Sequence, residues 1–99
     1  MQRDDAIRLL CGRREHFYEL GVGRLFLYGS VARNEASEDS DVDLLVEPSN
    51  HQFSIFDLVR VRDLCCIVLG TTADIHDYAG LRRLPEFRRR VGNDLVRVF

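Results

Sequence analysis

Lysine and tryptophan are absent from this chain of 99 residues, and methionine occurs once. All 14 basic residues are therefore arginines, whose planar guanidinium group suits contacts with phosphate and with protein partners. Genome composition explains this choice of basic residue equally well. No apolar run reaches the ~18 residues that a membrane-spanning helix needs, so we expect no membrane association.

Cysteine is also scarce, with Cys11, Cys65 and Cys66 the three in the chain. Their odd number and their spacing match neither a zinc site nor a disulfide framework. We predict that they are small apolar side chains on helices. Residues 1–5 are polar and acidic, unlike a secretory signal, and together these features predict a cytoplasmic protein.

The length and composition predict one folded domain, residues 1–99. A hydrophobic content of 45% is too high for a disordered chain, while so short a chain leaves little room for an enclosed substrate chamber. The net charge of −2 gives no overall basic footprint, so direct binding to nucleic acid is not expected.

The distribution of charge is more informative than its sum. Between residues 34 and 59 there is no arginine, yet six carboxylates lie between 35 and 47, and these repel one another unless solvent or a cation relieves them. They are Glu35, Glu38, Asp39, Asp41, Asp43 and Glu47. The arginines gather elsewhere, notably at Arg82, Arg83, Arg88, Arg89 and Arg90.

Hydrophobic periodicity and the glycine and proline stops predict alternating helices and strands. Helices are expected at residues 4–20, 30–36, 50–69 and 85–91, and strands at 24–28, 41–47 and 71–76. Residues 95–98 form either a last short strand or an extension of the preceding helix. This order predicts an α/β or α+β fold with a small mixed sheet flanked by helices.

The predicted helix 50–69 carries an apolar stripe that we expect to face the core. The stripe consists of Phe53, Phe56, Val59, Leu64, Cys65 and Val68. Gly70 follows as a helix stop.

Two carboxylates, Asp41 and Asp43, stand one residue apart in an otherwise apolar run. On a strand they project from the same face, with Cα atoms roughly 6.6 Å apart. Carboxylates in this arrangement suit one shared magnesium ion or two bridged ions. Asp-x-Asp alone is weak evidence, because aspartates at strand ends are usually solvated.

A Gly29-Ser30 turn precedes this pair by ten residues. Glycine lets the backbone approach a ligand closely, and the free amides of a following helix can hold a phosphate group. We expect Ser30 near the N-cap of that helix. A Gly-Ser turn is common by itself, whereas its combination with a flanking strand and Asp-x-Asp is much more specific.

The stretches 29–33 (Gly-Ser-Val-Ala-Arg) and 39–46 (Asp-Ser-Asp-Val-Asp-Leu-Leu-Val) resemble the minimal nucleotidyltransferases. These belong to the DNA polymerase beta-like nucleotidyltransferase superfamily. The resemblance extends from the strand before Gly29 to the C-terminus and implies the nucleotidyltransferase fold. The family often has Arg-Gly where this chain has Arg33-Asn34, and Asn34 can adopt the left-handed conformation that glycine would supply.

The resemblance implies a third carboxylate on a later strand, and Asp74 fits that position. Asp74 also interrupts a strand-like stretch, where an unpaired carboxylate would be costly if buried. Asp77 is the competing candidate, although it is expected just beyond the strand. His76 could share the face of Asp74 and assist phosphate binding, or it could be a surface or core histidine without such a role.

The resemblance implies an enzyme that transfers AMP from ATP with the help of Mg²⁺, with two ions expected. Asp41, Asp43 and Asp74 would be the catalytic carboxylates and metal ligands. Gly29 and Ser30 would hold the triphosphate, and Arg33 would either join them or face solvent. The expected acceptor is a hydroxyl group, a tyrosine above all, of a small HEPN-domain toxin, which makes this chain the antitoxin of a type VII-like toxin–antitoxin pair and a possible hetero-oligomer.

A non-catalytic binding module is the alternative, in which the chain neutralises its partner by contact alone and the carboxylates are idle. Its interface would use exposed aromatic side chains or the arginines at 88–90. The aromatic candidates are Phe17, Tyr18, Phe53 and Phe56.

Overall fold

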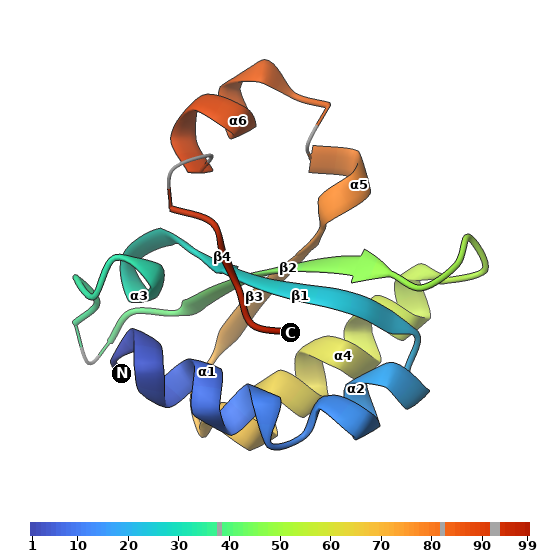
Figure 1. The fold of residues 1–99 in the computed structure, drawn as a ribbon, viewed down its shortest axis with the longest axis horizontal. Helices are drawn as coiled ribbons and strands as arrows, with labels where there is room; N and C mark the ends of the chain where they lie inside the picture. The colour runs from blue at the N-terminus through green and yellow to red at the C-terminus, as the bar shows by residue number, and fades with distance from the viewer. Residues whose placement is uncertain (38, 82, 92–93) are drawn as a thin grey trace.

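A four-stranded mixed sheet in the order β3-β2-β1-β4 forms the centre of the computed structural model (Figure 1). The strands are β1 (Val22–Tyr28), β2 (Val42–Pro48), β3 (Ala73–Asp77) and β4 (Val96–Arg97). β1 pairs antiparallel with β2 and with β4, and β2 pairs parallel with β3. The predicted fold class, a small mixed sheet flanked by helices, is confirmed.

The structure describes residues 1–37, 39–81, 83–91 and 94–99, and it does not describe the side chains at 79, 88 and 90. The sequence expectations that involve Glu38, Arg82, Arg88 and Arg90 therefore lie wholly or partly outside the described residues.

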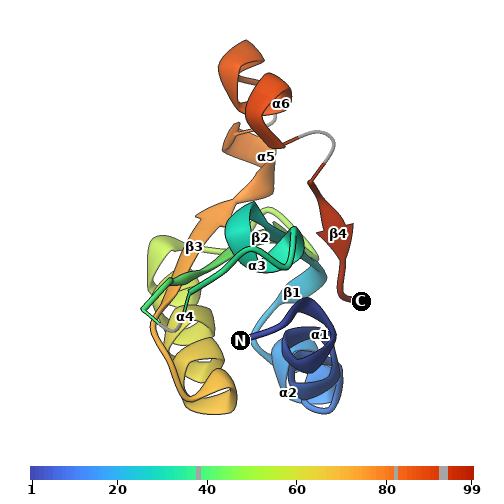
Figure 2. The same ribbon diagram turned by 90° about the vertical axis from the view of Figure 1, so that its left-hand side faces the viewer.

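Helices lie on both sides of the sheet (Figures 1 and 2). One side is covered by α1 (Arg3–Cys11), α2 (Arg14–Glu19) and α4 (Ile55–Leu69), and the other side carries α5 (Tyr78–Leu81) and α6 (Pro85–Val91). The short α3 (Gly29–Ala32) follows β1 directly. None of the helices in the described ranges is long and apolar enough to span a membrane.

The core lies between the sheet and the helices α1, α2 and α4. Because side chains alternate along a strand, one set of strand residues is buried in this layer together with Leu10, Phe17 and Val61. The set comprises Leu25, Leu27, Val42, Leu44, Val46, Ala73 and Ile75. Of the intervening residues, which point to the opposite face of the sheet, Leu45 is also buried, whereas Tyr28 and Asp43 are half-buried and Asp74 is exposed. The alternation thus separates a packed face from a face available for chemistry.

The single helix predicted at residues 4–20 is wrong, because the chain forms two helices that are separated at Gly12 and Arg13. The Gly12 N–H still donates to the Arg8 carbonyl at 3.1 Å, whereas the Arg13 N–H donates to Leu10 only three residues back at 3.0 Å. Glycine inside a helix costs about 1 kcal/mol relative to alanine, so the helix breaks where its propensity is lowest.

The long helix begins at Ile55 rather than at residue 50. Ser54 is its N-cap, and a capping box with Asp57 fixes the start, since the Ser54 side chain accepts from the Asp57 N–H while Asp57 accepts from the Ser54 N–H. The predicted inward stripe is also wrong in part, because Phe56 and Val59 are exposed. The fully buried positions of this helix are Val61, Cys65 and Leu69.

Smaller differences occur at the other elements. α3 spans Gly29–Ala32 with Tyr28 at its N-cap, so the expected helix 30–36 with Ser30 near the N-cap is wrong. Residues 96–97 form a strand on β1, which decides between the two readings of the C-terminal segment. The short α5 was not expected from the sequence.

Candidate active site

Asp43 and Asp74 lie side by side on adjacent parallel strands. The register of β2 and β3 pairs Asp43 with Asp74 and places the neighbouring Leu44 opposite Ile75. Neighbouring strands are about 4.8 Å apart, and laterally paired residues point to the same face of a sheet. The structure therefore brings together two carboxylates that are 31 positions apart in the sequence.

The electrostatics of Asp43 are those of a crowded acidic site. Burial raises the pKa of its carboxyl group above the ordinary value, and the charges of Asp74 and Asp41 raise it further. His76 and Arg33 act in the opposite direction. Three acidic side chains thus interact at one place on the open face of the sheet, and their mutual repulsion makes the ionised form of Asp43 costly.

Asp41 is placed differently from the sequence expectation. It is exposed and directly precedes β2, so the two aspartates do not both lie within the strand. Its Oδ1 accepts a hydrogen bond from the Thr72 hydroxyl, and Thr72 immediately precedes the chain's entry into β3. Asp41 is therefore fixed at the end of β2, where its charge still acts on Asp43.

Gly29 links the turn to the acidic site. Its φ of 74° lies in the left-handed region, which glycine adopts without the steric cost that other residues meet. A Cβ atom on Gly29 would also collide with Oδ2 of Asp43. Only glycine satisfies both conditions, and its absent side chain is the reason the Asp43 carboxylate can lie against the backbone of the turn.

The turn continues into α3, whose first amides have no acceptor within the helix, as at any helix start. Ser30 is half-buried there, and its carbonyl accepts from the Glu35 N–H at 2.8 Å. The free backbone N–H groups of this segment can donate hydrogen bonds to an anion. Binding of a triphosphate by Gly29 and Ser30 stays a prediction.

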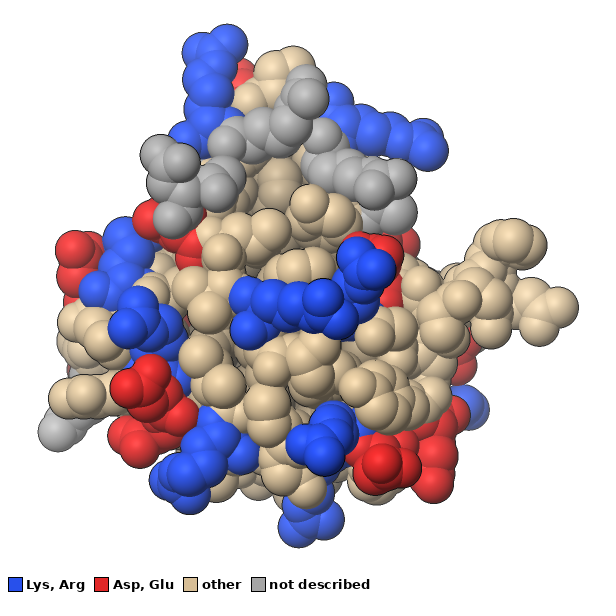
Figure 3. Space-filling view, in the orientation of Figure 1, with Lys and Arg blue, Asp and Glu red and all other residues tan. Residues whose placement is uncertain are grey.

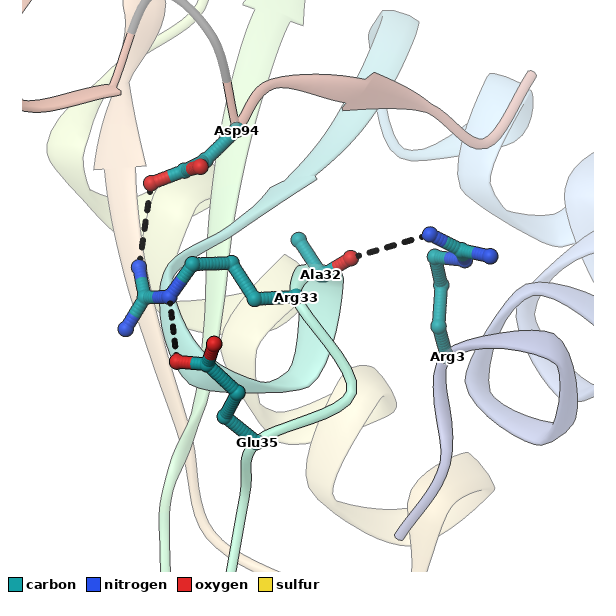
Figure 4. A network of polar contacts seen from close by, with 5 residues as sticks. All are labelled: Arg3, Ala32, Arg33, Glu35 and Asp94. Atoms are coloured by element: carbon teal, nitrogen blue, oxygen red, sulfur yellow. Dashed lines mark hydrogen bonds and ion pairs between the residues drawn. The ribbon is translucent and has the colours of Figure 1, made fainter.

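Arg33 lies at the centre of a polar network that ties the turn to the C-terminal segment (Figure 4). Its guanidinium group donates to Glu35 and to Asp94, each at 3.0 Å. Asn34 has the left-handed φ of 58° that the sequence comparison with Arg-Gly anticipated. Arg33 is thus oriented by two carboxylates, and its contact with a phosphate stays a prediction.

Arg3 supports the same segment from α1. Its side chain donates to the Ala32 carbonyl at 3.3 Å (Figure 4), and its backbone N–H donates to Oδ1 of Asn34 at 2.8 Å. The end of α3 is therefore fixed from the N-terminal side as well. On the face drawn in Figure 3, arginine side chains are spread among acidic and uncharged ones and form no continuous basic patch.

Two groups beside the acidic pair add to the site. His76 shares the face of Asp74, with its Nε2 3.4 Å from Oδ2 of that carboxylate. Tyr28 precedes the Gly29 turn, and burial together with the charges of Asp43 and Asp74 raises the pKa of its hydroxyl to about 12. Sequence reasoning missed Tyr28, although the alternation along β1 places it on the same face as the carboxylates.

A cavity of about 280 Å³ adjoins these two residues and continues to Leu81, Phe87 and Val91. The Phe87 ring lies edge-on to Tyr28, with ring centroids 6.0 Å apart. Asp77, the competing third carboxylate, is three positions beyond Asp74 and alternates to the opposite face of β3. It lines a separate cavity with Glu47 and His51, so the structure does not bring it to the acidic pair.

The acidic side chains suit a hard divalent cation, which prefers carboxylate oxygens and would relieve the repulsion at Asp43. Among the described residues, no three acidic, histidine or cysteine side chains are already arranged around one metal position. Asp41 is turned to Thr72 and Asp74 to His76. The donor chemistry fits a metal, and ligation by all three carboxylates requires rotation of their side chains.

Three comparisons with known proteins agree with this geometry. The family model described as "Nucleotidyltransferase domain" matches residues 10–95. A curated protein of Methanocaldococcus jannaschii, "Putative protein adenylyltransferase MJ0435", is 40% identical over 78 residues, which are 79% of this chain and 81% of that protein. A solved structure described as "Structure of putative minimal nucleotidyltransferase" is 33% identical, covers 97% of this chain and 95% of its own, and superposes with a TM-score of 0.72.

Proposed function

Because the chain belongs to the nucleotidyltransferase domain family, we propose that it transfers AMP from ATP to a hydroxyl group of a partner protein. One observation supports this more than any other. Asp43 and Asp74 are paired across β2 and β3, and Gly29 lies in contact distance of Asp43 at the start of α3. Carboxylates and an anion-binding turn at one place are the parts that nucleotidyl transfer requires.

The turn and the carboxylates would have separate tasks. The amides at the start of α3 and the Ser30 hydroxyl would bind the triphosphate, and the missing side chain of Gly29 would let it approach Asp43 closely. Asp74 would accept the proton of the attacking hydroxyl. The hydroxyl oxygen forms a bond to the α-phosphorus, the bond from that phosphorus to the bridging oxygen breaks, and pyrophosphate leaves with the electron pair.

Asp41, Asp43 and Asp74 would hold Mg²⁺, with two ions proposed. The bound metal would supply positive charge to the phosphate oxygens and to the departing pyrophosphate. The contribution of the chain is to keep three carboxylates close together despite their repulsion. Burial and then the charges of Asp74 and Asp41 raise the pKa of Asp43, and a bound cation would act in the opposite direction.

We further propose that the acceptor is a tyrosine of a HEPN-domain toxin, so that this chain acts as its antitoxin in the manner of type VII pairs. The resemblance of residues 29–33 and 39–46 to the minimal nucleotidyltransferases carries this proposal. The relative from Methanocaldococcus jannaschii is named as a protein adenylyltransferase, which is consistent with a protein acceptor. The short chain would obtain its second substrate from the partner.

Co-expression with a HEPN-domain partner tests the proposal. We expect the mass of the partner to rise by one or more AMP units, located on tyrosine by peptide mass spectrometry. The variant with Asp41→Asn and Asp43→Asn should leave the partner unmodified while remaining folded. A persistent mass increase with this double variant would reject the mechanism, and an AMP group on serine or threonine would reject the choice of acceptor.

A binding module is favoured by one observation, the exposure of Phe56, which is 75% accessible to solvent. Of the other aromatic residues considered for such an interface, Phe17 is fully buried and Phe53 is half-buried, whereas Tyr18 is 46% exposed and lies edge-on to Phe99 with ring centroids 5.3 Å apart. The exposed surface is therefore smaller than the sequence suggested.

Thermal unfolding distinguishes the two functions. Addition of MgCl₂ and a non-hydrolysable ATP analogue together should raise the melting temperature of the purified chain by several degrees, about 2.7 kcal/mol at a ligand concentration of 100 times Kd. EDTA should remove the shift. A melting temperature that is unchanged by saturating Mg²⁺ and nucleotide would favour the binding module.

A further inference from the structure

The outer side of α4 exposes more apolar surface than any other helix in the described part of the chain. Six large hydrophobic residues are exposed, and four of them lie on this helix. Phe56 and Ile67 are the most exposed, at 75% and 78%, followed by Ile55 and by Val59 at 41%. Isolated exposed hydrophobics are normal, but four on one helix indicate a contact surface.

The exposed positions of α4 follow the spacing of a helix-pairing seam. Phe56, Arg60, Asp63 and Ile67 are separated by four, three and four residues, an average close to the 3.5-residue repeat along which two helices pack. All four are exposed. The seam has an apolar residue at each end and one charge of each sign in the middle.

We propose that this surface binds a second copy of the chain through antiparallel packing of α4 against α4. In that arrangement Phe56 of each copy meets Ile67 of the other, and Arg60 of each copy meets Asp63 of the other. The order of the residues along α4 makes the seam complementary to itself, as a two-fold symmetric interface requires. A parallel arrangement would instead oppose Arg60 with Arg60 and Asp63 with Asp63, which is repulsive.

The charged residues of the seam are available for this exchange. Arg60 lies 3.7 Å from Asp57 within its own helix, and Asp63 lies 3.5 Å from Arg62. Arg60, Arg62 and Asp63 are exposed and Asp57 is half-buried, and ion pairs at the surface contribute little to stability. In the dimer, the weak ion pairs within one helix are replaced by Arg60–Asp63 ion pairs between the copies. Phe56 and Ile67 exclude water from both ends of the seam and so shield these pairs from solvent.

The interface leaves the candidate active site accessible. Buried Val42, Leu44 and Ile75 face the layer that contains α4, whereas Asp43 and Asp74 face the other side of the sheet. Two copies joined through α4 therefore present their acidic sites outward, away from each other. One helix per copy forms a small interface, so we expect dissociation constants on the order of micromolar to tens of micromolar.

Sedimentation velocity over a concentration series up to about 0.5 mM tests the proposal. The unmodified chain should pass from monomer to dimer, and Phe56→Asp with Ile67→Asp should weaken dimerisation at least about 50-fold, because the apolar Phe56–Ile67 contact is lost at both ends of the interface. Circular dichroism checks that the exposed substitutions leave the fold intact. A chain that stays monomeric throughout, or a double variant that dimerises as before, would overturn the proposal.

A mixing experiment tests the register. Arg60→Asp alone and Asp63→Arg alone should each dimerise poorly, because like charges face each other, whereas a one-to-one mixture should form a heterodimer with two restored ion pairs. Arg14→Asp is the matched control, since it makes the same charge change at an exposed position of α2 outside the seam, and it should dimerise normally. A mixture no more dimeric than its components would exclude the antiparallel register.

Discussion

Replacing Asp43 by asparagine is expected to abolish AMP transfer and, at the same time, to stabilise the metal-free protein. On the proposed function, in which Asp43 would hold Mg²⁺, the loss of transfer should be at least about 10³-fold. The melting temperature should rise by roughly 2–5 °C, as happens when a strained charge of an active site is neutralised. Calorimetry and a transfer assay on the same preparation measure both effects.

The gain in stability should depend on pH in a defined direction. Burial and the charges of Asp74 and Asp41 raise the pKa of Asp43 in the folded protein above its ordinary value of 3.8. The folded state therefore binds this proton more tightly than the unfolded state, and stability falls as pH rises from the ordinary value through the raised one. The Asp43→Asn variant has no carboxyl group at this position and does not lose this stability. Its gain in melting temperature over the unmodified chain should therefore be absent at low pH and complete at neutral pH.

Asp4→Asn is the matched control for Asp43→Asn. Asp4 is 90% exposed and lies 3.8 Å from the Arg3 guanidinium, so its neutralisation should leave transfer unchanged and should not raise the melting temperature. If Asp43→Asn instead lowers the melting temperature at pH 7, the inference that the ionised Asp43 carboxylate destabilises the folded protein is wrong.

Gly29→Ala is expected to cause the second large effect, a loss of transfer of about 10²-fold or more together with a loss of stability. The new Cβ atom would collide with Oδ2 of Asp43 and displace that carboxylate. The left-handed φ of 74° adds a backbone cost of about 1 kcal/mol for alanine. Transfer assays and thermal unfolding measure the two contributions.

Gly70→Ala separates the contribution of the backbone from that of the collision. Gly70 has nearly the same φ of 69° at the end of α4, but a Cβ atom there would meet nothing within 4 Å. The control should lose about 1 kcal/mol of stability and keep its activity. Equal activity of the two glycine variants would show that the approach of Asp43 to Gly29 has no part in transfer.

Local patterns in the sequence predict the strands well. The apolar runs at 24–28, 41–47 and 71–76 lie within two residues of β1, β2 and β3 at each end. Gly29 and Asp43 lie against each other in the structure, and Asp74, chosen by resemblance, is paired with Asp43. Its catalytic role, like those of Asp41 and Asp43, stays a prediction.

Tertiary contacts decide what local patterns leave open. The inward face of α4 is set by packing on β3 and α1, which buries Val61, Cys65 and Leu69 and leaves Phe56 exposed. Because α4 carries apolar residues on both its buried and its exposed side, the sequence pattern alone does not identify the side that faces the core. The position of Tyr28 beside the carboxylates likewise depends on the pairing of β1 with β2, in which Tyr28 lies opposite Asp43.

The place of β3 at the edge of the sheet affects the order in which the molecule assembles. β1 and β2 are joined by a short segment, whereas β3 can pair with β2 only after α4 has returned the chain across the sheet. Contacts between distant parts of a chain form late in folding and open early. A partly folded form that kept only the β1–β2 pair would therefore hold Asp43 without Asp74 opposite it.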